Sequence, residues 1–441
     1  MSARKNPIER RLELVHDEWL DFSELPEARV LCLLVTPDEI PMVDAFVAVE
    51  SHEQAGSLPD LFVRLVSPFD AQTPYGFALC GEFAPIAEAM HEGLEDPATP
   101  AWSPPRANRG EDDVSLWVRT CVSFADHYQI PAQFAALLEP STLSDLGQFT
   151  LWLQRFAQQA PARIRAVVLD DVKAPQLTPL VTAEPVRVVA EPLELDMPGA
   201  RLELSQEAGG LDTPGGKFRH LFVQMSNALG ESKLPEAEAF GNQALAITQA
   251  QGWFGLAVPI HFALGAANAG AGQAPVANER YVKAELAAIE GEKAGDVTCT
   301  KLRAQARMAR GGLLVGIGQY LAAATLFTET IPFATAAEDP RMVLDCYRLT
   351  SFCYEGAQKY PEAWQAGSDG LGYATKLDQE TRQTSNLPYL GEGMLRIAAR
   401  PEFNATLRVE REMVALLGKT DWRPQTSAAA GAPAQSPAGR S

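Results

Sequence analysis

Apolar residues in the second half of the chain recur with the spacing of paired amphipathic helices. Each of four apolar segments precedes a short phrase that ends in alanine and opens a further helical segment. The phrases lie at 233–237, 273–277, 319–323 and 359–363, so they begin 40, 46 and 40 residues apart. Such a recurrence is typical of stacked helical hairpins. The pattern predicts four units of helix, tight turn and helix between about 218 and 374.

Three of the four phrases contain a proline where the second helix of the unit would begin. These residues are Pro235, Pro275 and Pro361. The first turn of a helix does not use the N–H that proline lacks, and the fixed φ of proline is already helical. The alanine that ends each phrase leaves room for the two helices to approach closely. The phrases therefore predict the start of each second helix.

A small residue lies twelve positions before the phrase alanine in three units, as Gly265, Gly311 and Ser351, whereas the first unit has Met225. With the helix-turn-helix pattern, these positions resemble tetratricopeptide (TPR) repeats, whose paired helices cross at a small residue. The spacing exceeds the roughly 34-residue TPR period. The resemblance is therefore to a looser, TPR-like array, and it implies a groove formed mainly by the first helix of each hairpin.

The first half of the chain alternates apolar runs with helical patterns. The runs predict strands at 29–35, 61–66, 134–139, 163–170 and 186–190. The helical patterns lie at 6–23, 40–49, 75–92, 114–127 and 142–159. Strands that are apolar on both faces and alternate with helices belong to a parallel sheet covered on both sides. We therefore predict an α/β domain with an N-terminal helix over 1–195.

Composition changes twice after this α/β region. Residues 196–216 are polar and contain five glycines, which predicts a linker. The TPR-like repeat domain is then expected over 217–420, with helices at 380–399 and 405–417 that cap the last hairpin. Residues 421–441 are mostly small or polar, which predicts a disordered tail.

Charge is distributed unevenly along the chain. The whole chain has 56 acidic and 37 basic residues; residues 1–200 hold 31 and 14 of them, a net charge of −17, which leaves 25 and 23 for the remainder. An acidic surface repels phosphates, so we expect neither a nucleic acid nor an anionic membrane as partner. No apolar run approaches 18 residues, and no signal peptide is apparent. These features predict a cytoplasmic protein.

Cysteine and histidine residues form no recognisable metal or redox motif. The six cysteines include no C-x-x-C pair and lie mostly in apolar runs, which predicts reduced core thiols. The six histidines are scattered without metal-ligand spacing. We expect no metal site and no cofactor.

The order of elements in the first half resembles the P-loop nucleotidase core of bacterial STAND-type regulators, in which helical repeats often follow that core. The resemblance implies that Asp170 or Asp171 matches the acid that helps to hold Mg²⁺. A P-loop needs a glycine-rich turn ending in Gly-Lys-Ser/Thr after the first strand. Residues 36–41 instead read Thr-Pro-Asp-Glu-Ile-Pro. The sequence thus predicts a degenerate core, and the alternative is an ATP-dependent switch that uses another loop.

Groove positions of the TPR family, carried onto this sequence, give ten candidate partner-binding residues. They are Arg219, Phe222, Ser226, Phe262, Gln305, Met308, Asp345, Arg348, Phe352 and Glu355. Aromatic side chains mixed with arginine and carboxylates suit the binding of a peptide or helix. A second interpretation places Phe222 and Phe262 in the core.

These patterns together predict a non-catalytic adaptor, scaffold or chaperone that binds a protein or peptide. A bacterial secretion or signalling system is the expected setting. Two other hypotheses stay open: a STAND-like nucleotide switch, and a structural scaffold that associates with itself.

Overall fold

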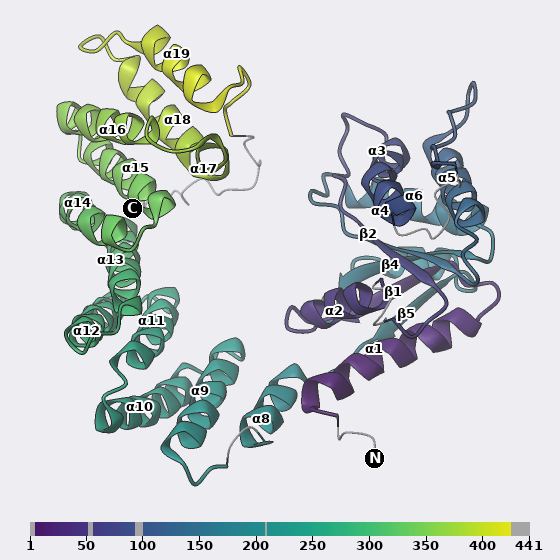
Figure 1. The fold of residues 1–441 in the computed structure, drawn as a ribbon, viewed down its shortest axis with the longest axis horizontal. Helices are drawn as coiled ribbons and strands as arrows, with labels where there is room; N and C mark the ends of the chain where they lie inside the picture. Colours follow the sequence, from purple (N-terminus) through teal and green to yellow (C-terminus); the bar gives the residue numbers. More distant parts are fainter. Residues whose placement is uncertain (1–4, 52–55, 93–99, 208–209, 425–441) are drawn as a thin grey trace, which may run out of the picture. The chain divides into compact units, whose positions relative to one another are not determined.

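A computed structural model describes residues 5–51, 56–92, 100–207 and 210–424 of the chain. The backbone divides into two compact units, residues 1–204 and 205–441. The first is an α/β unit built on a parallel sheet, and the second is an array of helical hairpins (Figure 1). The predicted fold class, a parallel α/β domain followed by a TPR-like array, is confirmed. The tail predicted over 421–441 lies outside the described residues from 425 onward.

The sheet of the first unit has five parallel strands in the order β2-β3-β4-β1-β5. They are β1 (Val30–Val35), β2 (Leu61–Leu65), β3 (Phe134–Leu138), β4 (Ile164–Asp171) and β5 (Val188–Pro192). All five were predicted, with boundaries within two residues. Alternate residues of β1 enter two separate cores: Val30 and Cys32 one, Leu31 and Leu33 the other. Burial on both faces explains why these strands are continuously apolar.

The helices of this unit are α1 (Pro7–Glu24), α2 (Ile40–Glu50), α3 (Tyr75–Gly81), α4 (Phe83–Glu92), α5 (Asp113–His127), α6 (Leu146–Gln159), α7 (Thr178–Ala183) and α8 (Met197–Glu207). The single helix expected over 75–92 is wrong, because two helices meet at Glu82. Pro85 has no N–H to donate to the Gly81 carbonyl, so the helical ladder is interrupted there. Glu82 instead accepts hydrogen bonds from the N–H groups of Val66 and Ser67.

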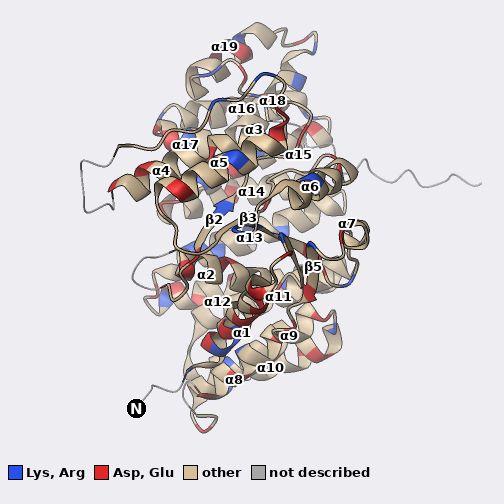
Figure 2. Cartoon of the chain, turned by 90° about the vertical axis from the view of Figure 1, so that its right-hand side faces the viewer, with Lys and Arg blue, Asp and Glu red and all other residues tan. Residues whose placement is uncertain are grey.

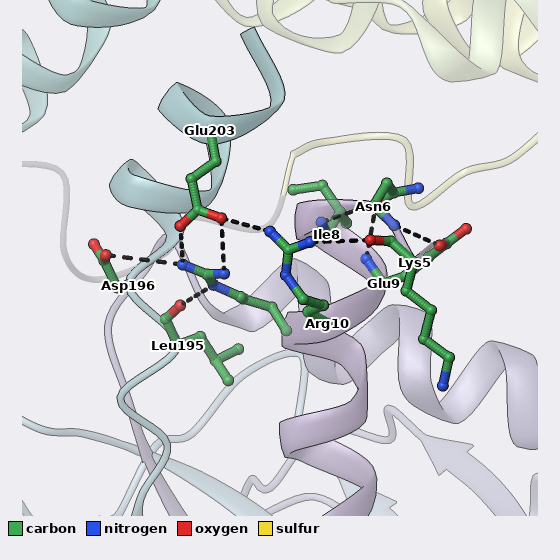
Figure 3. A network of polar contacts seen from close by, with 9 residues as sticks. Lys5, Asn6, Ile8, Glu9, Arg10, Leu195, Asp196 and Glu203 are labelled. Atoms are coloured by element: carbon green, nitrogen blue, oxygen red, sulfur yellow. Dashed lines mark hydrogen bonds and ion pairs between the residues drawn. The ribbon is translucent and has the colours of Figure 1, made fainter. Parts of the chain in front are cut away.

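Helix α8 occupies part of the interval that we expected to be a linker. Arg10 and Arg11 of α1 hold Glu203 of α8 at 2.6 and 2.9 Å, and Arg11 also donates to the carbonyl of Leu195 (Figure 3). Hydrogen bonds from Arg11 and Arg10 lower the pKa of the Glu203 carboxyl. Residues 197–207 therefore form a helix tied to α1, and the division between the two units falls inside the interval predicted as a linker.

The second unit contains four helical hairpins followed by three cap helices. The hairpins are α9 (Pro214–Gly230) with α10 (Leu234–Gln251), α11 (Phe254–Gly270) with α12 (Ala274–Lys293), α13 (Thr298–Gly316) with α14 (Tyr320–Ala336), and α15 (Pro340–Gly356) with α16 (Tyr360–Ala374). The caps are α17 (Gln379–Thr384), α18 (Leu387–Ala398) and α19 (Thr406–Leu417). Every second helix begins one residue after the start of its phrase, as predicted.

Each hairpin turn has the same backbone geometry. The residue before the N-cap of the second helix has a positive φ, at Ser232, Gly272, Gly318 and Gln358. The next N–H then donates to the carbonyl five residues earlier, for example from Gln319 to Leu314 at 2.8 Å. This is the bond of a Schellman motif, which satisfies a carbonyl at the end of the first helix. The turn therefore ends one helix and starts the next within three residues.

In the first three hairpins, the two helices cross where a large side chain faces a small residue. A Cβ added to Gly265 would lie 2.8 Å from the Tyr281 ring, and one added to Gly311 would lie 2.3 Å from the Phe327 ring. The first hairpin reverses the arrangement, because Met225 lies on the first helix and Gly241 on the second. A Cβ on Gly241 would lie 3.0 Å from the Met225 sulfur. Met225 is thus accommodated by its partner position.

The fourth hairpin has a small residue on both helices, and a cap helix fills the remaining space. Ser351 is buried and donates its hydroxyl to the Ala363 carbonyl at 2.8 Å. Met394 of α18 lies against Gly367, where an added Cβ would come within 2.0 Å of its sulfur. The last hairpin therefore depends on α18 for close packing, as the end of a repeat array requires.

Substitution at one crossing tests this packing. Gly311→Ala places a methyl group against Phe327, so we expect a loss of about 1–3 kcal/mol in the free energy of unfolding. The neighbouring Gly312 has no atom within 4 Å of an added Cβ, so Gly312→Ala should leave stability unchanged or raise it by up to about 1 kcal/mol. Denaturant unfolding of both variants measures the difference. Equal effects of the two substitutions would contradict the crossing model.

Candidate functional site

Two adjoining hollows run along the first helices of the hairpins. One, of about 740 Å³, lies against α9, α11 and α13, and the other, of about 670 Å³, against α11, α13 and α15. Pro259 and Leu302 line both hollows, so the two are continuous. Figure 1 shows α11 and α13 on the inner side of the helical array and α12 and α14 on its outer side. We call the two hollows together the inner trough.

Helical periodicity brings the lining residues of each helix to one face. On α13, Leu302, Gln305 and Ala309 follow the spacing i, i+3 and i+7 and line the second hollow. On α11, Val258 and Phe262 do the same with a spacing of four. The floor and walls of this hollow are mainly apolar, and α15 adds charged side chains at one side.

Acidic residues of the trough are already paired within the array. Asp339 caps α15 by accepting the N–H of Met342 at 3.0 Å, and it lies 3.1 Å from the Lys301 ammonium. Burial raises the pKa of Asp339, but the Met342 hydrogen bond and Lys301 outweigh it and the net shift is downward. Asp345 accepts hydrogen bonds from Arg348 at 3.0 Å and from Asn386 at 2.9 Å. These carboxylates are partly buried and held in fixed positions.

Basic residues around the trough are more exposed than these acids. Arg219 lines the first hollow and Arg341 the second, and both side chains are exposed. Lys301 is 53% exposed, whereas its partner Asp339 is 20% exposed. Arg341 donates to the Thr384 hydroxyl at 2.8 Å, a neutral partner. The outer edge of the trough therefore presents cations to the surroundings.

The structure brings four of the ten predicted groove residues together in the second hollow. They are Phe262, Gln305, Met308 and Asp345. Phe262 is 38% exposed and its ring meets the Tyr281 ring edge-on at 5.7 Å. It therefore lies at the surface of the trough, with one edge packed on Tyr281.

The other predicted residues lie apart from that hollow. Arg219 lines the first hollow. Arg348, Phe352 and Glu355 line a smaller hollow of about 180 Å³ against α18, where Glu355 pairs with Arg396 at 2.9 Å. Neither Phe222 nor Ser226 lines these three hollows in the described part of the chain. Phe222 is half-buried and stacks on Phe218 at 5.9 Å, which agrees with its assignment to the core.

Several lining residues were not among the predictions. Family groove positions come from the middle of each first helix, whereas the hollows follow the N-terminal halves of these helices. Apolar residues at a spacing of three or four from the predicted ones could have revealed them. They include Val258, Leu302 and Met342, together with Pro259 and Arg341.

The carboxyl edge of the sheet in the first unit is the other place where a ligand could bind. Helix α2, after β1, packs on one face of the sheet, and α7, after β4, packs on the other. β1 and β4 are neighbouring strands. The connection that follows β1 and the connection that follows β4 therefore diverge to opposite faces at this point of the sheet. Open α/β sheets bind ligands at such a switch point.

Carboxylates of the chain itself occupy the N–H groups at this switch point. Glu39 is 5% exposed and accepts the N–H and the hydroxyl of Thr36 at 2.7 and 2.9 Å, and the N–H of Leu195 at 2.6 Å. Asp170 accepts the N–H groups of Gln176 and Leu177. Donors that a phosphate would need are therefore already used by fixed negative charges, in agreement with the degenerate loop read from the sequence.

Other chemistry finds little support in the described residues. No group of three or more His, Cys, Asp or Glu residues could hold a metal ion there. All six cysteines are free thiols, five of them buried, and burial raises the pKa of the Cys346 thiol to about 12. None of the helices in the described ranges is both long and apolar enough to cross a membrane.

Comparisons with known proteins found similarity only to solved structures. No protein-family model and no curated protein matches the chain. Among solved structures, the apo form of RapI is 14% identical with a TM-score of 0.40, and the match covers 51% of this chain and 64% of that one. A Rap protein in complex with competence and sporulation factor is 11% identical with a TM-score of 0.31, over 78% of this chain and 75% of that one.

A STAND protein with a tetratricopeptide repeat sensor from Pyrococcus horikoshii is 10% identical with a TM-score of 0.25. That match covers 94% of this chain and 93% of the other. Identities and TM-scores of this size give no guide to function. The functional argument therefore rests on the residues of this chain.

A half-buried histidine beside the trough gives a prediction about pH. Burial lowers the pKa of His261 to about 4, and Arg280 and Lys283 act in the same direction. The unfolded chain keeps a pKa near 6.5, so it binds the proton first as pH falls. The contribution of His261 to the free energy of unfolding should be fully present above pH 6.5. It should be lost as the pH falls towards 4, by roughly 2 kcal/mol after allowance for partial exposure of the side chain.

His261→Gln removes this titration. Urea unfolding between neutral and mildly acidic pH should show a smaller decline in the variant than in the unsubstituted chain. Parallel declines in both proteins would show that His261 is not responsible.

The switch point gives a second prediction. Glu39→Ala leaves three donors without their acceptor, so we expect a loss of about 2–3 kcal/mol in the free energy of unfolding. Asp38→Ala is the control, because Asp38 is 50% exposed and makes a surface ion pair with Arg201.

Thermal unfolding with and without Mg-ATP should show no shift for the unsubstituted chain. A shift of several degrees would contradict the self-occupied switch point.

Proposed function

We propose that the chain is a non-catalytic binding protein that holds a segment of another protein in the inner trough. The observation that carries this proposal is the continuous hollow along α9, α11, α13 and α15, lined by apolar side chains from successive hairpins. Apolar surface that stays exposed in such a groove marks a site for a partner. A regulatory or adaptor role in the cytoplasm is the setting that we propose.

Two properties of the trough support a protein partner over a small substrate. The trough extends across four helices, and its carboxylates Asp339 and Asp345 are held by neighbouring residues. Side chains with strongly shifted pKa values arranged for acid–base chemistry are missing from the lining that the structure describes. A long, mainly apolar groove fits a polypeptide segment better than a reacting small molecule.

The nucleotide-switch alternative has no specific observation in its favour. Glu39 and Asp170 occupy the donors at the sheet edge, and residues 36–41 offer no lysine to neutralise phosphates. The first unit is therefore proposed to serve as a structural or protein-binding domain that has lost nucleotide.

Site-specific cross-linking tests the proposal. A photoreactive phenylalanine analogue at Phe262 should form an adduct with one defined protein in the source cells, because this side chain faces the trough. The same analogue at Leu286, which is 55% exposed on α12, should not form that adduct. Met342→Glu on the opposite wall should reduce the Phe262 adduct without changing the melting temperature much.

Three outcomes would count against the proposal. Equal cross-linking from Leu286 would show non-specific adhesion. An adduct with a second copy of the chain would favour the self-associating scaffold. No adduct at Phe262 would remove the support for a trough partner.

A further inference from the structure

The inner trough differs from many peptide grooves in the polar groups that its walls offer. In the second hollow, Gln305 is the uncharged polar side chain of the lining, and the remaining polar residues are Asp339, Arg341 and Asp345. The two acids are held by neighbouring basic groups. Beyond their first turns, the first helices use most of their backbone N–H and C=O groups internally, with the Gly255 carbonyl opposite Pro259 as an exception. The walls therefore provide few hydrogen bonds to an incoming backbone.

The small number of hydrogen-bonding groups in the walls favours one of two kinds of occupant, an extended segment or an α-helix. An extended segment carries an unpaired N–H and C=O on nearly every residue, and half of these would face the apolar wall. Buried without partners, such groups cost free energy that apolar contacts must offset. An α-helix satisfies its own backbone and presents only side chains. The trough therefore suits a helix that lays an apolar stripe against Val258, Phe262 and Leu302.

The charges around the trough indicate what flanks that stripe. Arg219, Lys301 and Arg341 come from three different first helices, and each is exposed. Of the acids near them, Asp339 and Asp345 are less exposed and lie against basic partners, while Asp296 accepts hydrogen bonds from Thr298. A helix lying in the trough would thus meet cations along its edges. Complementarity requires carboxylates on either side of its apolar stripe.

From these observations we infer that the partner of the inner trough is an acidic amphipathic helix. The inference rests on the proposed function and specifies the chemistry of its partner. Such a helix would present apolar positions at i, i+3, i+4 and i+7 to the trough.

A display selection against the full chain tests the inference. One library has an apolar stripe at helical spacing, and all its remaining positions are drawn equally from Asp, Glu, Lys and Arg. A second library has the same composition with prolines inside the stripe, which prevents helix formation. We expect the first library to enrich clones of negative net charge and the second not to enrich. Enrichment of basic clones, equal enrichment of both libraries, or no enrichment would each overturn the inference.

Variants of the chain then locate the binding of an enriched peptide. Neutralising two cations together, Lys301→Gln with Arg341→Gln, should weaken its affinity at least about tenfold and reduce its salt dependence. Lys283→Gln on α12, where Lys283 pairs with Glu279, is the matched control and should leave affinity nearly unchanged. Equal losses in the two variants, or no loss in either, would contradict a trough bound through its cationic edges.

The outcomes separate this inference from the proposed function. If cross-linking from Phe262 still gives a defined adduct while no acidic helix is enriched, the trough binds a protein of other chemistry and only this inference fails. If neither experiment gives a positive result, the proposed function fails as well. Far-ultraviolet circular dichroism and melting temperatures of the variants show that a loss of binding does not come from unfolding.

Discussion

The helical array depends on the crossing inside each hairpin, where a side chain of the opposite helix or, in the fourth hairpin, of α18 fills the space that a small residue leaves. Gly265 faces Tyr281 and Gly311 faces Phe327, while the first hairpin places the large residue, Met225, on the other helix. Either helix can therefore carry the large side chain as long as the pair stays matched. This matching holds the two helices of a hairpin close together. The second helices thereby position the first helices, and the hollows lie between successive first helices that are positioned in this way.

Local sequence patterns were sufficient to locate the hairpins but not to describe their packing. The proline phrases identify the second-helix starts because turn and first-turn chemistry depend on neighbouring residues. Met225 looked like a departure from the repeat, since its compensating Gly241 lies on the other helix. Of the predicted groove residues, Phe262 and Gln305 line a common hollow. Phe222 instead stacks on Phe218, because the exposure of a side chain depends on how neighbouring helices meet.

The first unit shows the same division between local and distant information. Its strands were recognisable because burial on both faces makes each of them continuously apolar. Helix α8 was missed because the interval 196–216 is polar and contains five glycines, a composition that favours a linker. What fixes it is Glu203, which Arg10 holds across 193 positions of the sequence. The acidic composition of this unit, with carboxylates on α1 and α4 (Figure 2), gave no indication of that contact.

Helix capping also explains the charge pattern of the trough. Asp296 accepts the N–H of Thr298 at the start of α13, and Asp339 accepts that of Met342 at the start of α15. Helix N-termini favour such carboxylates because their first N–H groups lack partners and carry partial positive charge. The capping acids therefore lie partly buried in the array, and cations such as Lys301 lie outside them. At α13 and α15, a requirement of folding, the capping of a helix, thus places the carboxylates of the trough.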